Sequence, residues 1–419
     1  MKGISRFFTL YWIIYFPTCI AYNDLPGFSS IDEIMMGILF VYTFMKYSNR
    51  SINRRPWREF MVCLSIIAFY TLYSLMFGVN VAGGVWLDLL QEIRPYSIIF
   101  CTWILNPRFT KKQKKWMLGT MVITLFSWIF YHPQTLDTQV EAEFPILGQL
   151  AICTGMSWYL FTKETKRNRN IALLLVLTGM MAPKFKFMGE VVCFIAFVFF
   201  IKQRLNFKSP KTMIYVVLLV TVILMVTWTR FDAYYVSGLS NDELARPMTY
   251  KTSLRILWDY LPFGSGMGSF ACNGAWKFFS PLYYKYNLTG IWGLSPEMGY
   301  FICDAYYPTL AQFGIVGVFF FCWFWKRRLA TFDIIADMRY YRVAMITFCC
   351  LAIEQTADSS WLSGKGMGYC MLIALCLNAN RNMMEQRRRE EMRKKMLEKR
   401  RMAENSETEE LKLAENIKS

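Results

Sequence analysis

The sequence predicts an all-α polytopic membrane protein with about twelve transmembrane helices and one large outer loop. Three observations support this fold class. Hydrophobic residues make up 55% of the 419 residues and fall in long blocks. Lysine and arginine gather in alternate connections between these blocks, and one connection, residues 230–307, is far longer than the others.

The apolar blocks are the predicted membrane spans. A helix needs about 20 mostly apolar residues to cross roughly 30 Å of hydrocarbon, and its backbone hydrogen bonds are then satisfied internally. We expect spans at 7–22, 33–46, 59–77, 85–105, 116–131, 145–162, 171–183, 188–201, 213–229, 308–325, 341–357 and 361–377. The short blocks 171–183 and 188–201 share one turn and form either two spans or a tilted or re-entrant pair, so the count is twelve within about two.

The net charge of +17 would suit a nucleic-acid-binding protein, but its distribution argues against that class. Basic residues cluster in 46–58, 106–115, 163–170, 202–212 and 326–342, whereas the short connections 23–32, 78–84 and 132–144 contain none. Alternation of this kind follows the positive-inside rule. It predicts a membrane protein with both termini in the cytoplasm, a long loop on the outer side of the membrane and no nucleic-acid partner.

The chain divides into four parts: helices 1–9 in 1–229, an outer-loop subdomain in 230–307, helices 10–12 in 308–380 and a charged cytoplasmic tail in 381–419. The start resembles a signal peptide without a cleavage site, so we expect an uncleaved anchor. The tail predicts a helix that lies on anionic lipid, projects into solvent or binds a partner, and 404–419 is expected to be disordered. No internal repeat is evident, which disfavours transporters built from duplicated halves.

The long loop is rich in tryptophan and tyrosine, which suits an interfacial subdomain lying on the membrane. It also holds Cys272 and Cys303, the two cysteines that lie outside the predicted spans. An oxidising compartment would allow a disulfide between them. A disulfide and two free thiols both remain open.

Two groups of basic residues in the bundle are candidates for binding an anion, because charges inside a membrane are expensive and therefore often functional. Arg94 lies near the middle of a span. It either forms a structural ion pair with Glu92 or Asp88, or faces an outward-open cavity where its guanidinium binds an anion. Lys184 and Lys186 break the rule that the short outer loops avoid lysine, which indicates a ligand; snorkelling to lipid headgroups is the alternative. Near the last outer turn, Glu354, Asp358 and Lys365 are expected to pair with one another.

In the long loop, Arg230, Arg246, Lys251 and Arg255 precede a turn with Gly264, Gly266 and Gly268. A nucleotide-binding interpretation of this GxGxG pattern is weak, because no strand precedes it and no Lys-Ser/Thr follows. The glycines are expected to allow a tight turn, with backbone N–H groups available to a phosphate. Glu297 and Asp304 follow, either as a base beside these arginines or as their salt-bridge partners.

No metal or other cofactor is predicted. The single histidine, His132, cannot form a metal site alone, and no cluster of His, Cys and Asp accompanies it. An Asp-x-Asp motif, which would hold a metal-bound diphosphate, is absent from the sequence.

Two motifs together resemble the signature of the O-antigen polymerase and O-antigen ligase superfamily. The first is Arg255 followed by Pro262-Phe263-Gly264-x-Gly266-x-Gly268-x-Phe270; the second is Asp304-Ala-Tyr-Tyr-Pro followed by Gly314-Ile315-Val316-Gly317. In that family an arginine precedes a glycine-rich turn, and a polar residue then opens a helix that leads into a Gly-Ile-hydrophobic-Gly stretch. Ligases of the family typically carry histidine where this chain has Asp304, which favours a polymerase.

The resemblance implies a glycosyltransferase of GT-C-like architecture that works without a metal. It would polymerise a surface polysaccharide (O-antigen, capsule or exopolysaccharide) by transferring glycan from undecaprenyl diphosphate to a lipid-linked repeat unit on the periplasmic face. In this scheme Arg255, Arg94, Lys184 and Lys186 hold the diphosphate, with Arg246 and Arg230 in support. Asp304, or failing it Glu297, deprotonates the attacking hydroxyl. The implied partners are undecaprenyl-diphosphate-linked glycans and membrane lipids, with a chain-length regulator as a further candidate.

Two alternatives stay open. An O-antigen ligase would use the same lipid-linked donor but attach the glycan to lipid A core. A lipid-linked oligosaccharide flippase or another transporter would also need about twelve spans and buried cations. The long outer loop and the glycine-rich turn favour the polymerase over the transporter.

Overall fold

A computed structural model of the chain describes residues 2–24, 30–47, 54–131, 145–181, 184–206, 209–241 and 243–385, together with 388, 390–392 and 396–397 of the tail. All regular secondary structure in these residues is helical. The predicted all-α class is confirmed for this part of the chain. His132 and the segment 404–419 lie outside the described residues.

Every predicted apolar block corresponds to a helix. The first nine are α1 (Lys2–Asp24), α2 (Ile31–Tyr47), α3 (Arg54–Phe77), α4 (Ala82–Leu105), α5 (Lys111–Tyr131), α6 (Pro145–Phe161), α7 (Lys166–Leu177), α8 (Phe185–Ile195) and α9 (Pro210–Phe231). The last three are α13 (Gly314–Asp333), preceded by the short helix η6 (Tyr307–Phe313), α14 (Met338–Glu354) and α15 (Met367–Leu377). The long loop contributes α10 (Ala245–Asp259), α11 (Asn273–Lys277) and α12 (Pro281–Lys285).

Three helical segments of the described chain are long and apolar enough to cross a membrane: Arg54–Phe77, Pro210–Val236 and Tyr307–Asp333. The second of these exposes large apolar side chains such as Val217, Leu218 and Met225, a surface that suits lipid and not water. The predicted total of about twelve spans is not confirmed. Helix α4 illustrates the reason, because its 24 residues include the buried Asp88, Glu92 and Arg94.

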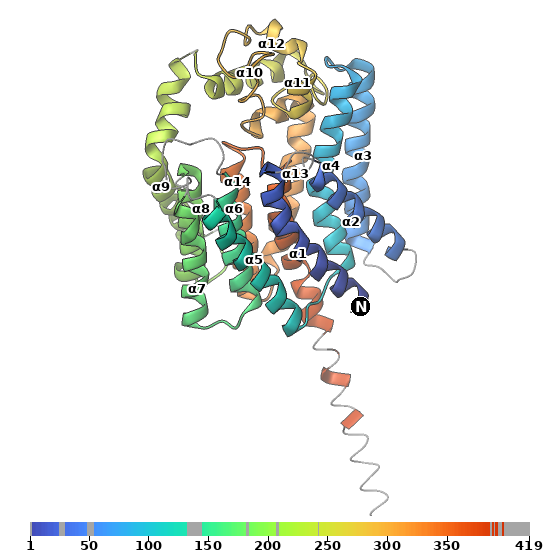
Figure 1. The fold of residues 1–419 in the computed structure, drawn as a ribbon, viewed down its shortest axis with the longest axis vertical. Coiled ribbons are helices and arrows are strands. Elements are labelled where there is room, and N and C mark those ends of the chain that lie inside the picture. The colour runs from blue at the N-terminus through green and yellow to red at the C-terminus, as the bar shows by residue number, and fades with distance from the viewer. Residues whose placement is uncertain are drawn as a thin grey trace, which may run out of the picture.

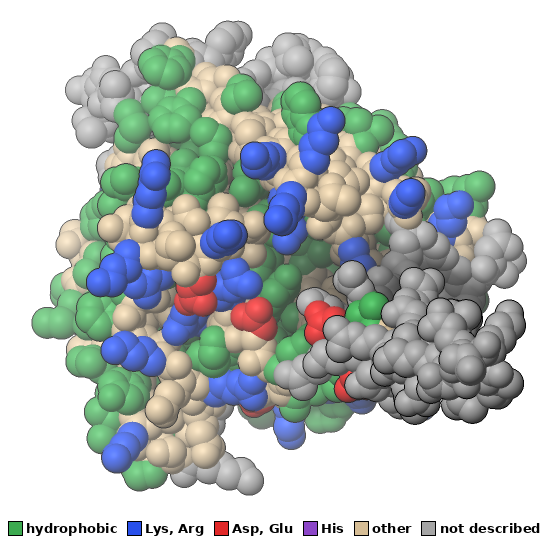
Figure 2. All heavy atoms as spheres, turned by 90° about the horizontal axis from the view of Figure 1, so that it is seen from below, with side chains coloured by type: hydrophobic (Ala, Val, Ile, Leu, Met, Phe, Trp, Pro, Cys, Tyr) green, Lys and Arg blue, Asp and Glu red, His purple; other side chains and the backbone are tan. Residues whose placement is uncertain are grey.

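The helices stand side by side, with α10, α11 and α12 covering the upper end of the bundle and residues 381–385 at the lower end (Figure 1). Lysine and arginine side chains gather on the lower face, where acidic side chains are few (Figure 2). Contacts between the basic connections agree with this view: Arg339 donates to the carbonyl of Thr162, and Arg108 pairs with Glu385. The basic connections that alternate in the sequence therefore meet at the end opposite the long loop.

The long loop folds as an ordered helical subdomain with its own apolar core, which includes Ile256, Phe270, Leu282, Leu288 and Ile302. A glycine-rich turn joins this subdomain to the bundle. Gly264, Gly266 and Gly268 all have positive φ, at 84°, 92° and 74°. The predicted tight turn is thereby confirmed, since residues with a Cβ rarely adopt this conformation.

Close packing of the glycine-rich turn makes Gly264 a sensitive position. A Cβ there would overlap the carbonyl oxygen of Gln312, and the left-handed φ alone costs about 1–2 kcal/mol for alanine. We therefore expect Gly264→Ala to cause a clear decrease in the melting temperature of the purified protein in detergent. Gly290→Ala is the matched control, because no described atom lies within 4 Å of the position that a Cβ would take at this glycine of the same loop. Equal melting temperatures for the two variants would contradict the assigned packing.

Candidate functional site

Charged side chains from several segments meet where the loop subdomain joins the bundle. We call Lys186, Arg246, Asp304, Glu354 and Asp358 the outer charge cluster. Lys186 lies at the start of α8, Arg246 in α10, Asp304 just before η6, Glu354 at the end of α14 and Asp358 in the turn that follows. The cluster therefore unites residues that are up to 172 positions apart in the sequence.

Arg246 and Asp304 form one ion pair of the cluster. The Arg246 Nη2 and Nε atoms lie 2.5 and 2.6 Å from Asp304 Oδ2, and the guanidinium stacks on the Tyr234 ring at 4.3 Å from its centroid. Burial raises the pKa of Asp304 above its usual value, although Arg246 partly offsets this effect. A carboxylate with a raised pKa is a better proton acceptor than an exposed one.

Lys186 forms the other pairs of the cluster. Its Nζ lies 2.6 Å from Glu354 Oε2 and 2.8 Å from Asp358 Oδ2, and Lys365 approaches Asp358 at 3.8 Å. Burial alone would raise the pKa of Asp358, but the two neighbouring ammonium groups hold it below its usual value. The predicted pairing of Asp358 with Lys365 is confirmed, whereas Glu354 pairs with Lys186 instead.

Tyrosines fix the backbone around the cluster. The hydroxyls of Tyr235 and Tyr250 donate to the carbonyl of Thr356 at 2.6 and 2.9 Å, and the backbone N–H of Tyr306 donates to the carbonyl of Gln355 at 3.1 Å. These bonds hold α10 and the segment containing Asp304 against the turn that carries Asp358.

Two more predicted cations lie beside the cluster. The guanidinium of Arg230, at the end of α9, lies 5.6 Å from the centroid of the Phe185 ring. Phe185 separates Lys184 from Lys186 in the chain. Ring contacts, ion pairs and chain connectivity thus bring Arg230, Lys184, Lys186, Arg246 and Asp304 into one region.

Arg94 forms its ion pairs with residues outside the outer charge cluster. It is only 2% exposed, its Nη1 lies 2.7 Å from Asp32 Oδ2, and it also pairs with Glu33 and donates to the carbonyl of Leu362. The predicted structural partners, Glu92 and Asp88, are wrong. Asp88 is held elsewhere, by the N–H of Gly268 at 2.9 Å and the amide of Gln312 at 2.7 Å.

Arg255 and Glu297 also lie away from the outer charge cluster's ion pairs. Arg255 follows Arg246 by nine residues in α10, which is about two and a half helical turns and puts the two side chains on opposite faces. Both Arg255 and Glu297 are exposed to solvent. The expectation that Arg255, Arg94 and Lys184 share one pocket receives no support from these positions.

The glycine-rich turn binds protein groups through its backbone. The N–H of Gly266 donates to the carbonyl of Gln312 at 2.9 Å, that of Met267 to Ser74 Oγ at 2.7 Å and that of Gly268 to Asp88. These donors are therefore occupied, and the expectation that Gly266 and Gly268 offer N–H groups to a phosphate is corrected. Asp88 is therefore the acidic group to which the turn is hydrogen-bonded.

An apolar groove of about 510 Å³ begins next to the outer charge cluster. Tyr307 and Gln355 line it at the cluster, and Lys326 and Asp333 line it toward the far end of α13. Between them the wall is formed mainly by apolar side chains of α13 and α14, such as Phe321, Trp325 and Phe348. A groove of this shape can accept a hydrocarbon chain with a polar group at the cluster.

The described residues contain no group of three or more His, Cys, Asp or Glu side chains placed to hold a metal ion. Cys272 and Cys303 are both free thiols in the structure. Of the two alternatives for these cysteines, the structure therefore has the unpaired one.

Sequence reasoning missed the carboxylates that neutralise the predicted cations. Asp32 and Glu33 are an acidic pair at the start of a span, a signal that a search for partners of Arg94 could have used. The sequence marks Glu354 and Asp358 as charged but does not identify them as partners of Lys186. No protein-family model and no curated protein sequence matches this chain.

We expect Arg94 to be essential for stability, because removing one partner of a buried ion pair leaves an uncompensated charge. Arg94→Met should cost about 3–5 kcal/mol of unfolding free energy. Arg255→Ala, at an exposed site, should change it by no more than about 0.5 kcal/mol. Denaturation in detergent measures both, and adding Asp32→Asn and Glu33→Gln to Arg94→Met should restore part of the loss. A stable Arg94→Met protein would contradict the structural role.

Proposed function

We propose that this chain is a polymerase of a bacterial surface polysaccharide, acting on undecaprenyl-diphosphate-linked glycans at the periplasmic face of the inner membrane. The observation that carries the proposal is the outer charge cluster. It combines a half-buried carboxylate, Asp304, with the cations Arg246 and Lys186. It lies where the loop subdomain meets the bundle, and Tyr307 and Gln355, close to cluster residues in the chain, line one end of an apolar groove.

The reaction would be a glycosyl transfer without a metal. A hydroxyl of the lipid-linked repeat unit attacks the anomeric carbon of the growing glycan, a new carbon–oxygen bond forms and the bond to the diphosphate breaks. The diphosphate leaves with the electron pair, and the hydroxyl proton passes to Asp304. Arg246 and Lys186, with Arg230 and Lys184 nearby, would stabilise the charge on the leaving diphosphate.

This assignment revises the roles suggested by the resemblance. Arg94 acts as a structural residue, and Arg255 and Glu297 have no part in the chemistry. The groove along α13 and α14 would hold part of the polyprenyl chain, so that its diphosphate reaches the cluster. About twelve spans, a GT-C-like architecture and cytoplasmic termini belong to the same proposal, supported by the basic face opposite the loop subdomain.

One observation favours a transporter as a second candidate. Glu190 and Glu354 are almost completely buried, and Glu190 accepts a hydrogen bond from Tyr369 at 3.1 Å. Lys186 is the cation that pairs with Glu354. Buried carboxylates inside a membrane bundle form the proton relays of many pumps and transporters. A flippase for lipid-linked oligosaccharides would use such a relay.

Asp304 provides a direct test of the chemistry. Asp304→Asn should lower polymer formation by about 10²–10⁴-fold, the usual contribution of a general base. In the unchanged protein the rate should fall as the pH drops through the raised pKa of Asp304, because the protonated group cannot accept the proton. The measurement is synthesis of polymer from lipid-linked repeat units by the purified protein in liposomes.

The matched control for this test is Asp259→Asn. Asp259 lies at the other end of α10, where it accepts a hydrogen bond from Tyr286 at 2.6 Å. This variant should keep near-normal activity and the same pH profile. If Asp304→Asn polymerises normally, Asp304 is not the base.

A deletion strain separates the two candidate functions. Loss of a polymerase should cause single repeat units on undecaprenyl diphosphate to accumulate in the outer leaflet of the inner membrane, because export continues while joining stops. Loss of a flippase should leave them in the inner leaflet. Labelling with a membrane-impermeant sugar-oxidising reagent, followed by mass analysis of the lipid fraction, distinguishes these outcomes, and inner-leaflet accumulation would overturn the polymerase proposal.

A further inference from the structure

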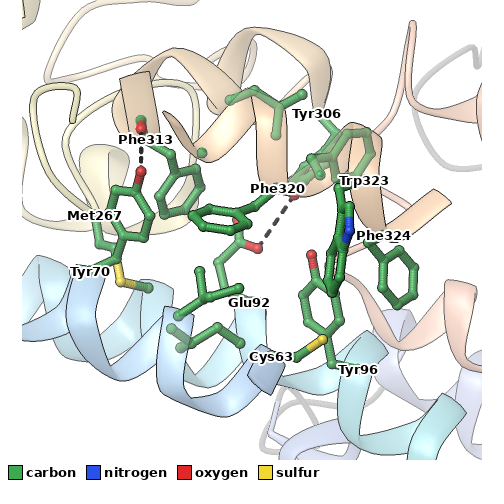
Figure 3. A pocket seen from close by; sticks show the side chains of 15 residues that line it. Cys63, Tyr70, Glu92, Tyr96, Met267, Tyr306, Phe313, Phe320, Trp323 and Phe324 are labelled. Carbon is green, nitrogen blue, oxygen red and sulfur yellow. Dashed lines mark hydrogen bonds between the residues drawn. The ribbon is translucent and has the colours of Figure 1, made fainter. Parts of the chain in front are cut away.

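A second cavity lies inside the bundle, apart from the outer charge cluster. It lies between α3, α4 and α13 next to Met267 of the glycine-rich turn and is partly open to the surface (Figure 3). Its volume is about 60 Å³. Aromatic side chains dominate its wall: Tyr96, Tyr306, Phe320, Phe321, Trp323 and Phe324.

Glu92 is the one carboxylate among the described residues that line this cavity, and no lysine or arginine is among them. Its side chain is 3% exposed. It extends from α4 toward Phe320 and Tyr306, whose hydroxyl donates to Glu92 Oε2 at 3.4 Å (Figure 3). The other oxygen, Oε1, has no hydrogen-bond partner in the described part of the chain.

The neighbouring charges on α4 are already engaged elsewhere. Arg94 is bound by Asp32 and Glu33, and Asp88 is bound by the glycine-rich turn and Gln312. Within the described residues, no basic side chain therefore balances the charge of Glu92. A buried carboxylate without a partner is strongly unfavourable unless it binds a proton or a cation.

The chemistry of the wall favours an organic cation over other ligands. Aromatic faces attract cations, and boxes of aromatic rings recognise substituted ammonium groups. Hard metal cations such as Ca²⁺ and Mg²⁺ need about six oxygen ligands, more than one carboxylate and a tyrosine hydroxyl supply. The volume holds roughly four to six water molecules at about 10–15 Å³ each, which is too little for a sugar ring.

We propose that this cavity is a binding site for a small alkylammonium cation, with Glu92 as its counter-ion and the aromatic rings as its wall. The ligand would leave the tyrosine hydrogen bond to Oε2 in place and approach the free Oε1. The proposal does not depend on the glycosyl transfer suggested for the outer charge cluster, because it uses none of that cluster's residues.

Calorimetric titration of the full-length protein in detergent tests the proposal. Tetramethylammonium has five non-hydrogen atoms, and tert-butanol is a neutral molecule of the same count. We expect saturable binding of tetramethylammonium, measured against matched sodium chloride, and at least tenfold weaker binding of tert-butanol. No binding of tetramethylammonium by the folded protein, or equal binding of both probes, would overturn the site; the latter result would mean that Glu92 carries only a proton.

Two variants assign the binding to Glu92. Glu92→Gln should weaken tetramethylammonium binding at least tenfold. Glu190→Gln should not, although Glu190 is also a buried carboxyl with one tyrosine partner and, in the described part of the chain, one oxygen without a partner. Equal affinity in Glu92→Gln and the unchanged protein would refute the proposal.

A third variant keeps the test decisive if Glu92→Gln does not fold. Phe320→Leu retains the carboxylate but removes one ring from the wall, so we expect binding to weaken about threefold or more. Unchanged affinity in this variant would contradict the aromatic box.

Discussion

The structure depends on the pairing of charges that are buried in an apolar bundle. An unpaired charge in such surroundings costs several kcal/mol, so an ion pair between two helices is a strong constraint on how they pack. Arg94 of α4 meets Asp32 and Glu33 of α2, Glu59 of α3 meets Arg328 of α13, and Lys186 of α8 meets Glu354 of α14. These pairs connect helices that apolar contacts alone would leave free to slide.

The glycine-rich turn applies the same constraint to the loop subdomain. Asp88 binds the turn and Gln312 together, so one buried carboxylate holds α4, the turn and η6 in register. Tyr70 adds a bond from α3 to the carbonyl of Phe313 at 2.7 Å. The subdomain cannot shift relative to the bundle without breaking these bonds. Arg246 and Asp304 are therefore held at a fixed position relative to Lys186.

The two candidate sites differ in how their charges are balanced. In the outer charge cluster every carboxylate faces a basic side chain, so an anionic ligand would have to exchange places with a protein carboxylate. In the inner cavity Glu92 faces rings and one hydroxyl. The first arrangement is the one for which we propose transient binding of a diphosphate, and the second is the one for which we propose a cation.

Much of the architecture follows from the sequence. Apolar blocks fixed the positions of the helices, because helix formation in lipid is local and hydrophobic length can be read along the chain. The tight turn at Gly264, Gly266 and Gly268 was expected from the sequence, and their positive φ values confirm it. The resemblance directed attention to Asp304 and to the cations ahead of the turn, and Arg246 does meet Asp304.

Partner choice was decided by tertiary structure. Arg94 has Glu92 two residues away and Asp88 six residues away, yet it binds Asp32 and Glu33, because the direction of a side chain on a helix depends on helix packing. Arg255 and Arg246 lie in one helix but on opposite faces, and only the packed fold defines which face is buried. The sequence by itself determined where helices, turns and charges occur; the fold determined which charges meet, since those contacts join segments more than 50 residues apart that no local pattern encodes.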